Sequence, residues 1–329
     1  MAFAFRSNNP IVLFLSKKNP HNKHPMKILK LILIGLLAVA SVEGSAQDYA
    51  FRVLVNKGKN EVKAGEAWQA IKVGSSLKSA DEVKVSENAY IGLAHVSGKT
   101  LELKQPGKYK VADLAARVSG NTSVLNKYTD FVLSANKERK NNLSATGSVT
   151  RGEEFLIYLP LPTMNPVVYN DVITIAWDSK LPSPYVVKFK SMFDDVLANI
   201  ETSDSSVTIN LSDAKFANED NIIVFVSSKT ATNKETEPYT LKRLSKADKE
   251  RIKTELTGFN QEQTAVAKLM LAAFYEKNGL LIDAGTAYQD AIKLEPTVPD
   301  FKVSYNQFLE DYNMKKSKEE PKGRKKKIE

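Results

Sequence analysis

The stretch from Ala265 to Val298 constrains the fold of this chain most, because it has the pattern of two helices packed antiparallel. Small residues recur where two helix backbones must approach closely, and aromatic residues stand where the space between helices must be filled. A glycine and a proline follow at the places where each helix must end. These positions are Ala272, Tyr275, Gly279, Ala284, Tyr288, Ala291 and Pro296. The pattern predicts a helical hairpin, a unit that binds other chains more often than it catalyses.

These residues resemble the tetratricopeptide motif, whose repeat is about 34 residues long. The resemblance implies a partner-binding groove on the concave side of the first helix, lined here by Val266, Leu269, Ala273, Glu276 and Lys277. A hydrophobic floor with charged residues at its edge suits an extended peptide or a partner helix. The alternative is that the helix before it covers Val266, Leu269 and Ala273, because a single repeat must bury that face somewhere.

The C-terminal region, residues 246–314, is predicted to be all-α, with helices over 246–256, 261–277, 280–294 and 299–314. Pro296 and Pro299 are expected to end the third helix and to orient the fourth. Since arrays of such repeats usually need about three units, the flanking helices are expected to act as caps. Residues 315–329 carry a run of like charges without an apolar face, which predicts a basic disordered tail.

The N-terminus has the pattern of a secretory signal peptide. Lys27 and Lys30 precede the apolar run 31–42, and the small residues Gly44 and Ala46 stand where a signal peptidase cuts. The run is shorter than the roughly 20 residues that cross a bilayer, so cleavage after Ala46 is preferred to an uncleaved anchor. Residues 1–46 are therefore predicted to be a start-site extension plus a signal peptide, and the mature form to have no integral membrane span.

Charge and cysteine content exclude several classes of protein. The formal charge is +9, but residues 1–46 and 315–329 each contribute +5, which leaves −1 for residues 47–314. A nearly neutral body argues against a nucleic-acid partner. The chain has no cysteine, so disulfides, thiolate nucleophiles, thiolate metal sites and a cysteine-linked lipid anchor are excluded.

Residues 47–111 show short runs of alternating apolar residues separated by turn signals such as Asn56-Lys57-Gly58, which predicts an all-β N-terminal domain. Val73-Gly74-Ser75-Ser76-Leu77, Ala89-Tyr90-Ile91-Gly92-Leu93 and Ser97-Gly98-Lys99-Thr100-Leu101 in this region resemble the FecR-like periplasmic domain. The resemblance implies a ligand-sensing or protein-docking module outside the cytoplasm. A transmembrane signalling role is not expected, because a cleavable signal stands where such regulators have a membrane span.

The middle of the chain is predicted to be a short helical segment followed by a β-sandwich. Residues 112–146 have helical spacing over 113–119 and 124–135 and then become a polar linker. Residues 147–245 contain alternating runs at Ile173 to Trp177, Tyr185 to Phe189, Val207 to Leu211 and Ile222 to Val226. Their order resembles a fibronectin type III or immunoglobulin-like sandwich, a fold whose presence says nothing about activity.

Residues that carry chemistry are few, and each has a structural explanation. His95 is the only histidine after residue 46; it falls in a predicted strand, and no Gly-x-Ser-x-Gly turn accompanies it. Asp194, Asp195 and Asp204 lack the spacing of a calcium loop. Glu153 and Glu154 could supply a carboxylate for glycoside chemistry, which needs two carboxylates flanking one bond, but they are more simply explained as the solvated start of a strand. No metal, cofactor or catalytic residue is predicted.

These observations predict a multidomain, non-enzymatic exported bacterial protein. The expected function is a periplasmic or cell-envelope scaffold that binds a protein partner through its C-terminal helices; surface display and secretion remain open. A first alternative is a glycan-binding protein that contacts peptidoglycan through Trp68 and Tyr90 of the N-terminal domain. A remote alternative is a carboxylate-dependent hydrolase, and the oligomeric state is left open.

Overall fold

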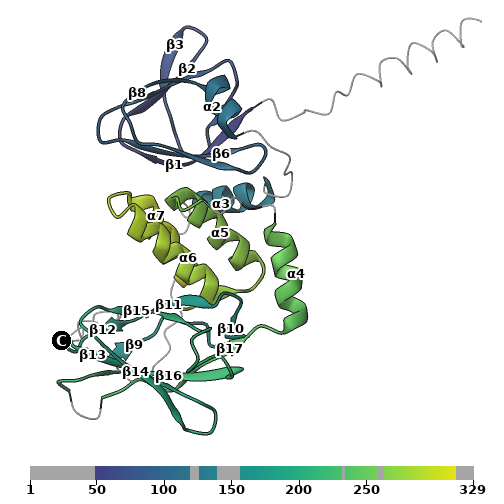
Figure 1. Cartoon of the computed structure of the whole chain (residues 1–329). Helices are drawn as coiled ribbons and strands as arrows, with labels where there is room; N and C mark the ends of the chain where they lie inside the picture. The colour runs from purple at the N-terminus through teal and green to yellow at the C-terminus, as the bar shows by residue number, and fades with distance from the viewer. Residues whose placement is uncertain are drawn as a thin grey trace, which may run out of the picture. The chain divides into compact units, whose positions relative to one another are not determined.

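β-Strands in several sheets fill the first and middle parts of the chain, and helices dominate its C-terminal part (Figure 1). The computed structural model describes residues 49–118, 126–138, 156–231, 234–257, 259 and 262–315. The predicted signal peptide, much of the predicted linker and nearly all of the basic tail lie outside these residues. Among the described residues, no helix is long and apolar enough to cross a bilayer.

The first β module consists of two four-stranded sheets, with strand orders β4-β1-β6-β7 and β3-β2-β5-β8. The strands are β1 (Phe51–Lys57), β2 (Asn60–Ala64), β3 (Ala67–Ala70), β4 (Ser76–Leu77), β5 (Glu82–Val85), β6 (Tyr90–His95), β7 (Thr100–Leu103) and β8 (Gly107–Lys110). Alternate apolar residues of both sheets, among them Phe51, Val83 and Ile91, form one core. The helix α2 (Val111–Val118) adds Val111, Leu114 and Val118 to that core.

The second β module has a five-stranded sheet, β10-β17-β16-β13-β14, and two strand pairs, β11-β15 and β12-β9. Its strands are β9 (Ile157–Tyr158), β10 (Val167–Val168), β11 (Val172–Ala176), β12 (Asp178–Ser179), β13 (Tyr185–Lys190), β14 (Val196–Thr202), β15 (Ser206–Asn210), β16 (Asn221–Ser228) and β17 (Tyr239–Arg243). Residues of the large sheet, such as Phe189 and Val224, share a core with Ile173 and Val207 of the β11-β15 pair. The apolar residues of the predicted alternating pattern therefore point into this core.

Five more helices are described: α3 (Asn126–Glu138), α4 (Lys246–Leu256), α5 (Ala265–Lys277), α6 (Leu281–Leu294) and α7 (Pro299–Asp311). α5 starts four residues later than predicted, because the Thr264 side chain accepts a hydrogen bond from the Ala267 amide and caps the helix there. Gly279, at a φ of 71°, separates α5 from α6. Ala272, Ala284 and Ala291 are fully buried between the helices, as their small size predicted.

The helices do not form a core of their own. One hydrophobic cluster joins α5, α6 and α7 to Tyr128, Val132 and Leu133 of α3 and to Leu54 and Tyr90 of β1 and β6. All six residues of β6 are buried, because one face belongs to the core of the first β module and the other contacts the helices. Residues 126–135, predicted to lead into a linker, therefore belong to the helical core, and residues from Tyr49 on form one compact unit.

Candidate functional site

The predicted partner groove of α5 is closed by the chain itself. Val266, Leu269 and Ala273 are at most 2% exposed. A Cβ atom added to Gly92 of β6 would lie 3.0 Å from Cγ2 of Val266, so the backbone of β6 lies directly on this helix face. The expectation of an open groove is corrected here: the face is covered by β1, β6 and α3 rather than only by the preceding helix.

The charged edge of that groove is also engaged within the chain. Glu276 is 7% exposed, and one of its carboxylate oxygens accepts a 2.8 Å hydrogen bond from the Tyr288 hydroxyl. The Lys277 ammonium group lies 5.3 Å from the centre of the Phe131 ring and 5.9 Å from that of Tyr128, both on α3. These contacts link α5 to α6 through Glu276 and α5 to α3 through Lys277. Glu276 is buried and not presented to a partner as the resemblance implied, whereas Lys277 is exposed at the surface.

A carboxylate from the first β module caps α5. Glu102 of β7 accepts a 2.9 Å hydrogen bond from the Val266 amide in the first turn of the helix, where the helix dipole favours negative charge. The same oxygen accepts a 2.6 Å bond from the Tyr90 hydroxyl, and Lys104 pairs with the other oxygen at 2.8 Å. Lys104 also pairs with Glu295, which immediately follows α6. Burial, followed by the charge of Glu102, raises the pKa of Tyr90, so this hydroxyl remains a donor.

The two residues proposed to stack on glycan do not share a surface. Trp68 lies on β3 and is partly exposed, whereas Tyr90 lies on β6 in the other sheet. Tyr90 is 3% exposed, with its ring 6.0 Å from that of Phe301 on α7. Tyr90 is thus a buried contact between module and helices, and Trp68 alone of this pair faces solvent.

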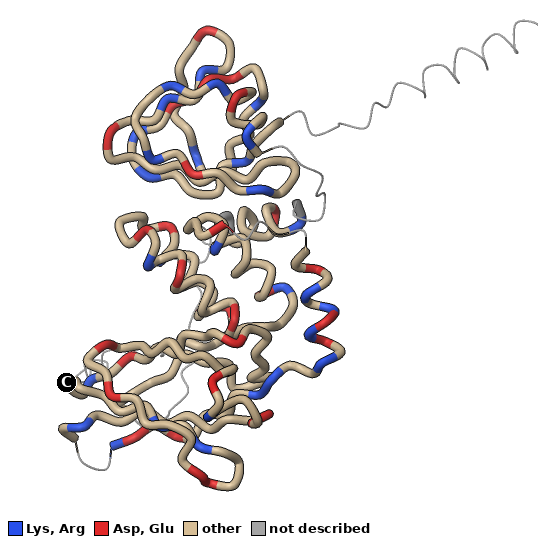
Figure 2. Tube along the Cα trace, in the orientation of Figure 1, with Lys and Arg blue, Asp and Glu red and all other residues tan. Residues whose placement is uncertain are grey.

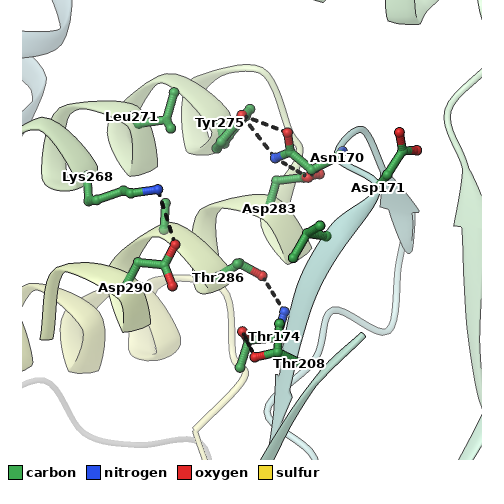
Figure 3. A pocket seen from close by; sticks show the side chains of 12 residues that line it. Asn170, Asp171, Thr174, Thr208, Lys268, Leu271, Tyr275, Asp283, Thr286 and Asp290 are labelled. Atoms are coloured by element: carbon green, nitrogen blue, oxygen red, sulfur yellow. Dashed lines mark hydrogen bonds and ion pairs between the residues drawn. The ribbon is translucent and has the colours of Figure 1, made fainter. Parts of the chain in front are cut away.

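A pocket of about 370 Å³ lies between α5, α6 and the β11-β15 pair (Figure 3). At its inner end is Asp283 of α6, a fully buried carboxylate. It accepts hydrogen bonds from the Tyr169 amide at 2.9 Å and from the Asn170 amide and side chain, both at 2.8 Å. The Tyr275 hydroxyl lies within hydrogen-bond distance of both the nitrogen and the oxygen of the Asn170 side-chain amide, at 2.9 Å and 3.2 Å. Burial raises the pKa of Asp283 to about 6, while the bonds from Tyr169 and Asn170 oppose that rise.

The rest of the pocket wall is made of paired polar groups. Lys268 of α5 and Asp290 of α6 form an ion pair at 3.3 Å, and the hydroxyls of Thr174 and Thr208 are 2.8 Å apart. The Thr286 hydroxyl accepts a 3.0 Å bond from the Thr174 amide, which ties α6 to β11. In Figure 3, Lys268 and Asp290 point toward each other between two helices, and Thr286 faces Thr174 across the boundary between helix and strand. The arrangement supplies attachment between modules and offers no nucleophile beside a base.

The pocket contains three carboxylates, which bears on the hydrolase alternative. Asp283 and Asp290 are seven residues apart on one helix, which places their backbone positions about 10 Å apart along its axis. Asp171 is bonded to Lys249 at 3.1 Å. The three N–H donors at Asp283 all come from Tyr169 and Asn170 of the same chain. Glu153 and Glu154 lie outside the described residues.

The remaining candidates for chemistry are structural. His95 lies in β6, as predicted; its Nδ1 is 2.8 Å from the Ser97 hydroxyl, and its ring meets that of Phe51 edge-on at 5.0 Å. Burial, aided by Lys99, lowers the pKa of His95. Asp194 pairs with Lys190 at 2.7 Å in the β13-β14 turn. The described part of the chain contains no group of three or more His, Asp or Glu side chains that could hold a metal ion.

Comparison with known proteins found no matching family model, and no curated protein matches the sequence. The FecR-like, immunoglobulin-like and tetratricopeptide-like resemblances therefore stay predictions that rest on the residues quoted for them. Function is argued below from contacts, burial and charge in the described residues.

Proposed function

We propose that the chain is an exported, non-catalytic cell-envelope scaffold whose helices couple two β modules and whose outward surfaces bind partners. The observation that carries the proposal is the use of the helix pair as an internal connector. Glu102 from the first module caps α5, and Asp283 of α6 binds the backbone of the segment before β11. A helix face that packs against its own chain connects the two modules. A partner protein must then bind to other surfaces. FecR-like, immunoglobulin-like and tetratricopeptide-like ancestry of the three parts belongs to the same proposal.

Spin labels can test the coupling directly, because the chain has no cysteine and any introduced pair is unique. Lys72→Cys in the first β module and Asp204→Cys in the second replace exposed residues. A single narrow distance distribution between the labels is expected from double electron–electron resonance. The pair Lys72→Cys and Lys110→Cys, within one module, sets the width that label motion alone produces. A between-module distribution several times wider than that reference would contradict the scaffold.

The turn between β13 and β14 is the surface best suited to a protein partner. Phe193 is 87% exposed, and Met192 and Val196 are each 56% exposed. The turn is held in shape by Ser191, whose hydroxyl accepts bonds from the amides of Phe193 at 3.1 Å and Asp195 at 3.2 Å. β14 is also the edge strand of the five-stranded sheet. An ordered apolar turn beside a free strand edge is typical of protein docking sites.

Replacing both Met192 and Phe193 with serine is expected to abolish capture of a protein partner from native envelope extract. The free energy of unfolding should remain within about 0.5 kcal/mol of that of the parent, because both side chains are exposed. The matched control replaces Met164 and Val303, which are also exposed, with serine and should retain capture. Mass spectrometry of the captured proteins provides the measurement. Equal capture by the parent and the Met192→Ser, Phe193→Ser variant would remove the turn as the docking surface.

Two larger changes to the helices would not test partner binding, because both would destabilise the fold. Deleting residues 246–329 to remove a partner groove would also remove the helices that bury Leu54 and Tyr90 of the first module. Replacing Leu269 and Glu276 together would truncate two buried side chains and cost about 3–5 kcal/mol of stability. Loss of capture in either variant would therefore report on folding rather than on binding.

A further inference from the structure

The outward face of the β3-β2-β5-β8 sheet combines one aromatic ring with several cations. Val83 and Val85 of β5 point into the module core, which directs Lys84 between them to solvent. Lys63 lies opposite Trp68, and Lys84 lies opposite both Glu61 and Lys108. We call this surface the Trp68 face; it consists of Glu61, Lys63, Trp68, Glu82, Lys84, Lys108 and Lys110.

Two like charges stand side by side on the Trp68 face. Lys84 and Lys108 are directly opposite each other in the antiparallel β5-β8 pair, an arrangement that lowers sheet stability. Their ammonium nitrogens lie 5.8 Å and 5.6 Å from the centre of the Trp68 ring. Lys84 is paired with Glu61 at 3.2 Å, whereas Lys108 has no ion-pair partner in the described part of the chain. An anion at this point would relieve the repulsion that the sheet otherwise sustains.

The charge of the whole first module points the same way. Residues 49–118 contain twelve Lys and Arg and seven Asp and Glu, a net charge of +5, whereas residues 119–314 carry −5. Figure 2 shows Lys and Arg spread over the strands of this module. The net charge of −1 for residues 47–314 is therefore the sum of a basic first module and an acidic remainder. The basic module attracts anionic ligands over a distance set by the ionic strength.

We propose that the Trp68 face binds an anionic polysaccharide of the cell envelope. The Trp68 indole would stack on a sugar ring, and Lys84 and Lys108 would pair with carboxylate groups of the same or neighbouring sugars. A polymer with rings and charges at short intervals matches an aromatic ring with two cations within 6 Å of its centre. A lipid surface is disfavoured because Trp68 is the only large apolar side chain of the face. The proposal rests on the export proposed above but not on the coupling of the two β modules.

The test measures binding of polygalacturonate, a uronic-acid polymer, to the chain from Gln47 to Glu329 at about 0.05 M salt, where screening is weak. Lys84→Gln with Lys108→Gln is expected to lower the affinity roughly tenfold, and Trp68→Ala a similar amount. Trp68→Phe, which retains an aromatic ring, should recover most of the loss. Neutral dextran should not bind.

The matched control removes two positive charges elsewhere. Lys246→Gln with Lys253→Gln changes two exposed lysines of α4 and should bind polygalacturonate like the parent. All variants retain the basic residues 315–329, so differences in affinity among the variants do not come from that segment. An equal loss in the α4 control, no effect of Trp68→Ala, or binding of phosphatidylglycerol vesicles in place of the polymer would each overturn the proposal.

Discussion

Replacing Asp283 with alanine is expected to destabilise the folded chain by about 3–5 kcal/mol. The substitution leaves three N–H donors without an acceptor: the amides of Tyr169 and Asn170 and the Asn170 side chain. All three belong to the segment between β10 and β11, so the attachment of α6 to the second β module is weakened, and the Thr174–Thr286 hydrogen bond remains. Urea unfolding, followed by circular dichroism, gives the difference in the free energy of unfolding.

The control lies seven residues later on the same helix. Asp290→Ala removes the same side chain from the same pocket, but Asp290 is half-buried and bonded only to Lys268 among the described residues. Its removal should cost less than about 1 kcal/mol, as for other solvent-screened ion pairs. Comparable losses in the two variants would show that the buried hydrogen bonds of Asp283 do not hold the module.

The pH dependence of stability gives a second reading of Asp283. Burial raises its pKa from 3.8 to about 6, so between these values the folded state holds a proton that the unfolded state has released. The proton-linked part of its contribution to stability, which adds to that of its hydrogen bonds, is therefore fully present below pH 3.8 and is lost as the pH rises through about 6. The stability difference between the parent and Asp283→Ala should grow by up to about 3 kcal/mol from pH 7 to pH 4. A difference that shrinks on acidification would contradict the raised pKa.

The sequence predicted the local structure well because local structure depends on short-range patterns. Alternation placed β1, β6, β13 and β16, and the small residues Ala272, Ala284 and Ala291 located the helix crossing. Helix boundaries depend on individual caps: α5 begins directly after its N-cap, Thr264, rather than at residue 261. His95 was correctly expected in a strand, because its position in the alternation of Ile91 and Leu93 is itself a local property.

The candidate site was harder to predict, because contacts between modules leave little trace in one sequence. Val266 and Leu269 are apolar whether a partner or β6 covers them, so composition could not distinguish the two. For the same reason, the sequence predicts Tyr90 to be a surface aromatic. Two weak signals were present: the acidic Asp283 stands between the apolar residues Ile282 and Ala284, and Gly92 leaves one position of a strand without a side chain. A buried charge and a strand glycine both indicate a close approach by another element.

Replacing Glu102 with alanine is expected to cost about 2–4 kcal/mol and to loosen α5 from the first β module. The carboxylate is buried beside β6 and α5, and its loss strands the Val266 amide and the Tyr90 hydroxyl inside the hydrophobic cluster. It also removes a negative charge from the N-terminus of α5. Glu102→Gln should lose less, because an amide oxygen can still accept the Val266 hydrogen bond.

Hydrogen exchange separates this effect from general destabilisation. In Glu102→Ala, the amides of the first turn of α5 should exchange faster than those at the centre of α6, because local opening needs only the lost cap. The labels at Lys72→Cys and Asp204→Cys should report a broader distance distribution in the same background. Glu61→Ala is the control, since Glu61 is a glutamate of the same module paired with Lys84 at the surface, and it should cost less than about 1 kcal/mol. If Glu102→Ala left both the exchange of α5 and the label distances unchanged, the helices would not be what couples the two β modules.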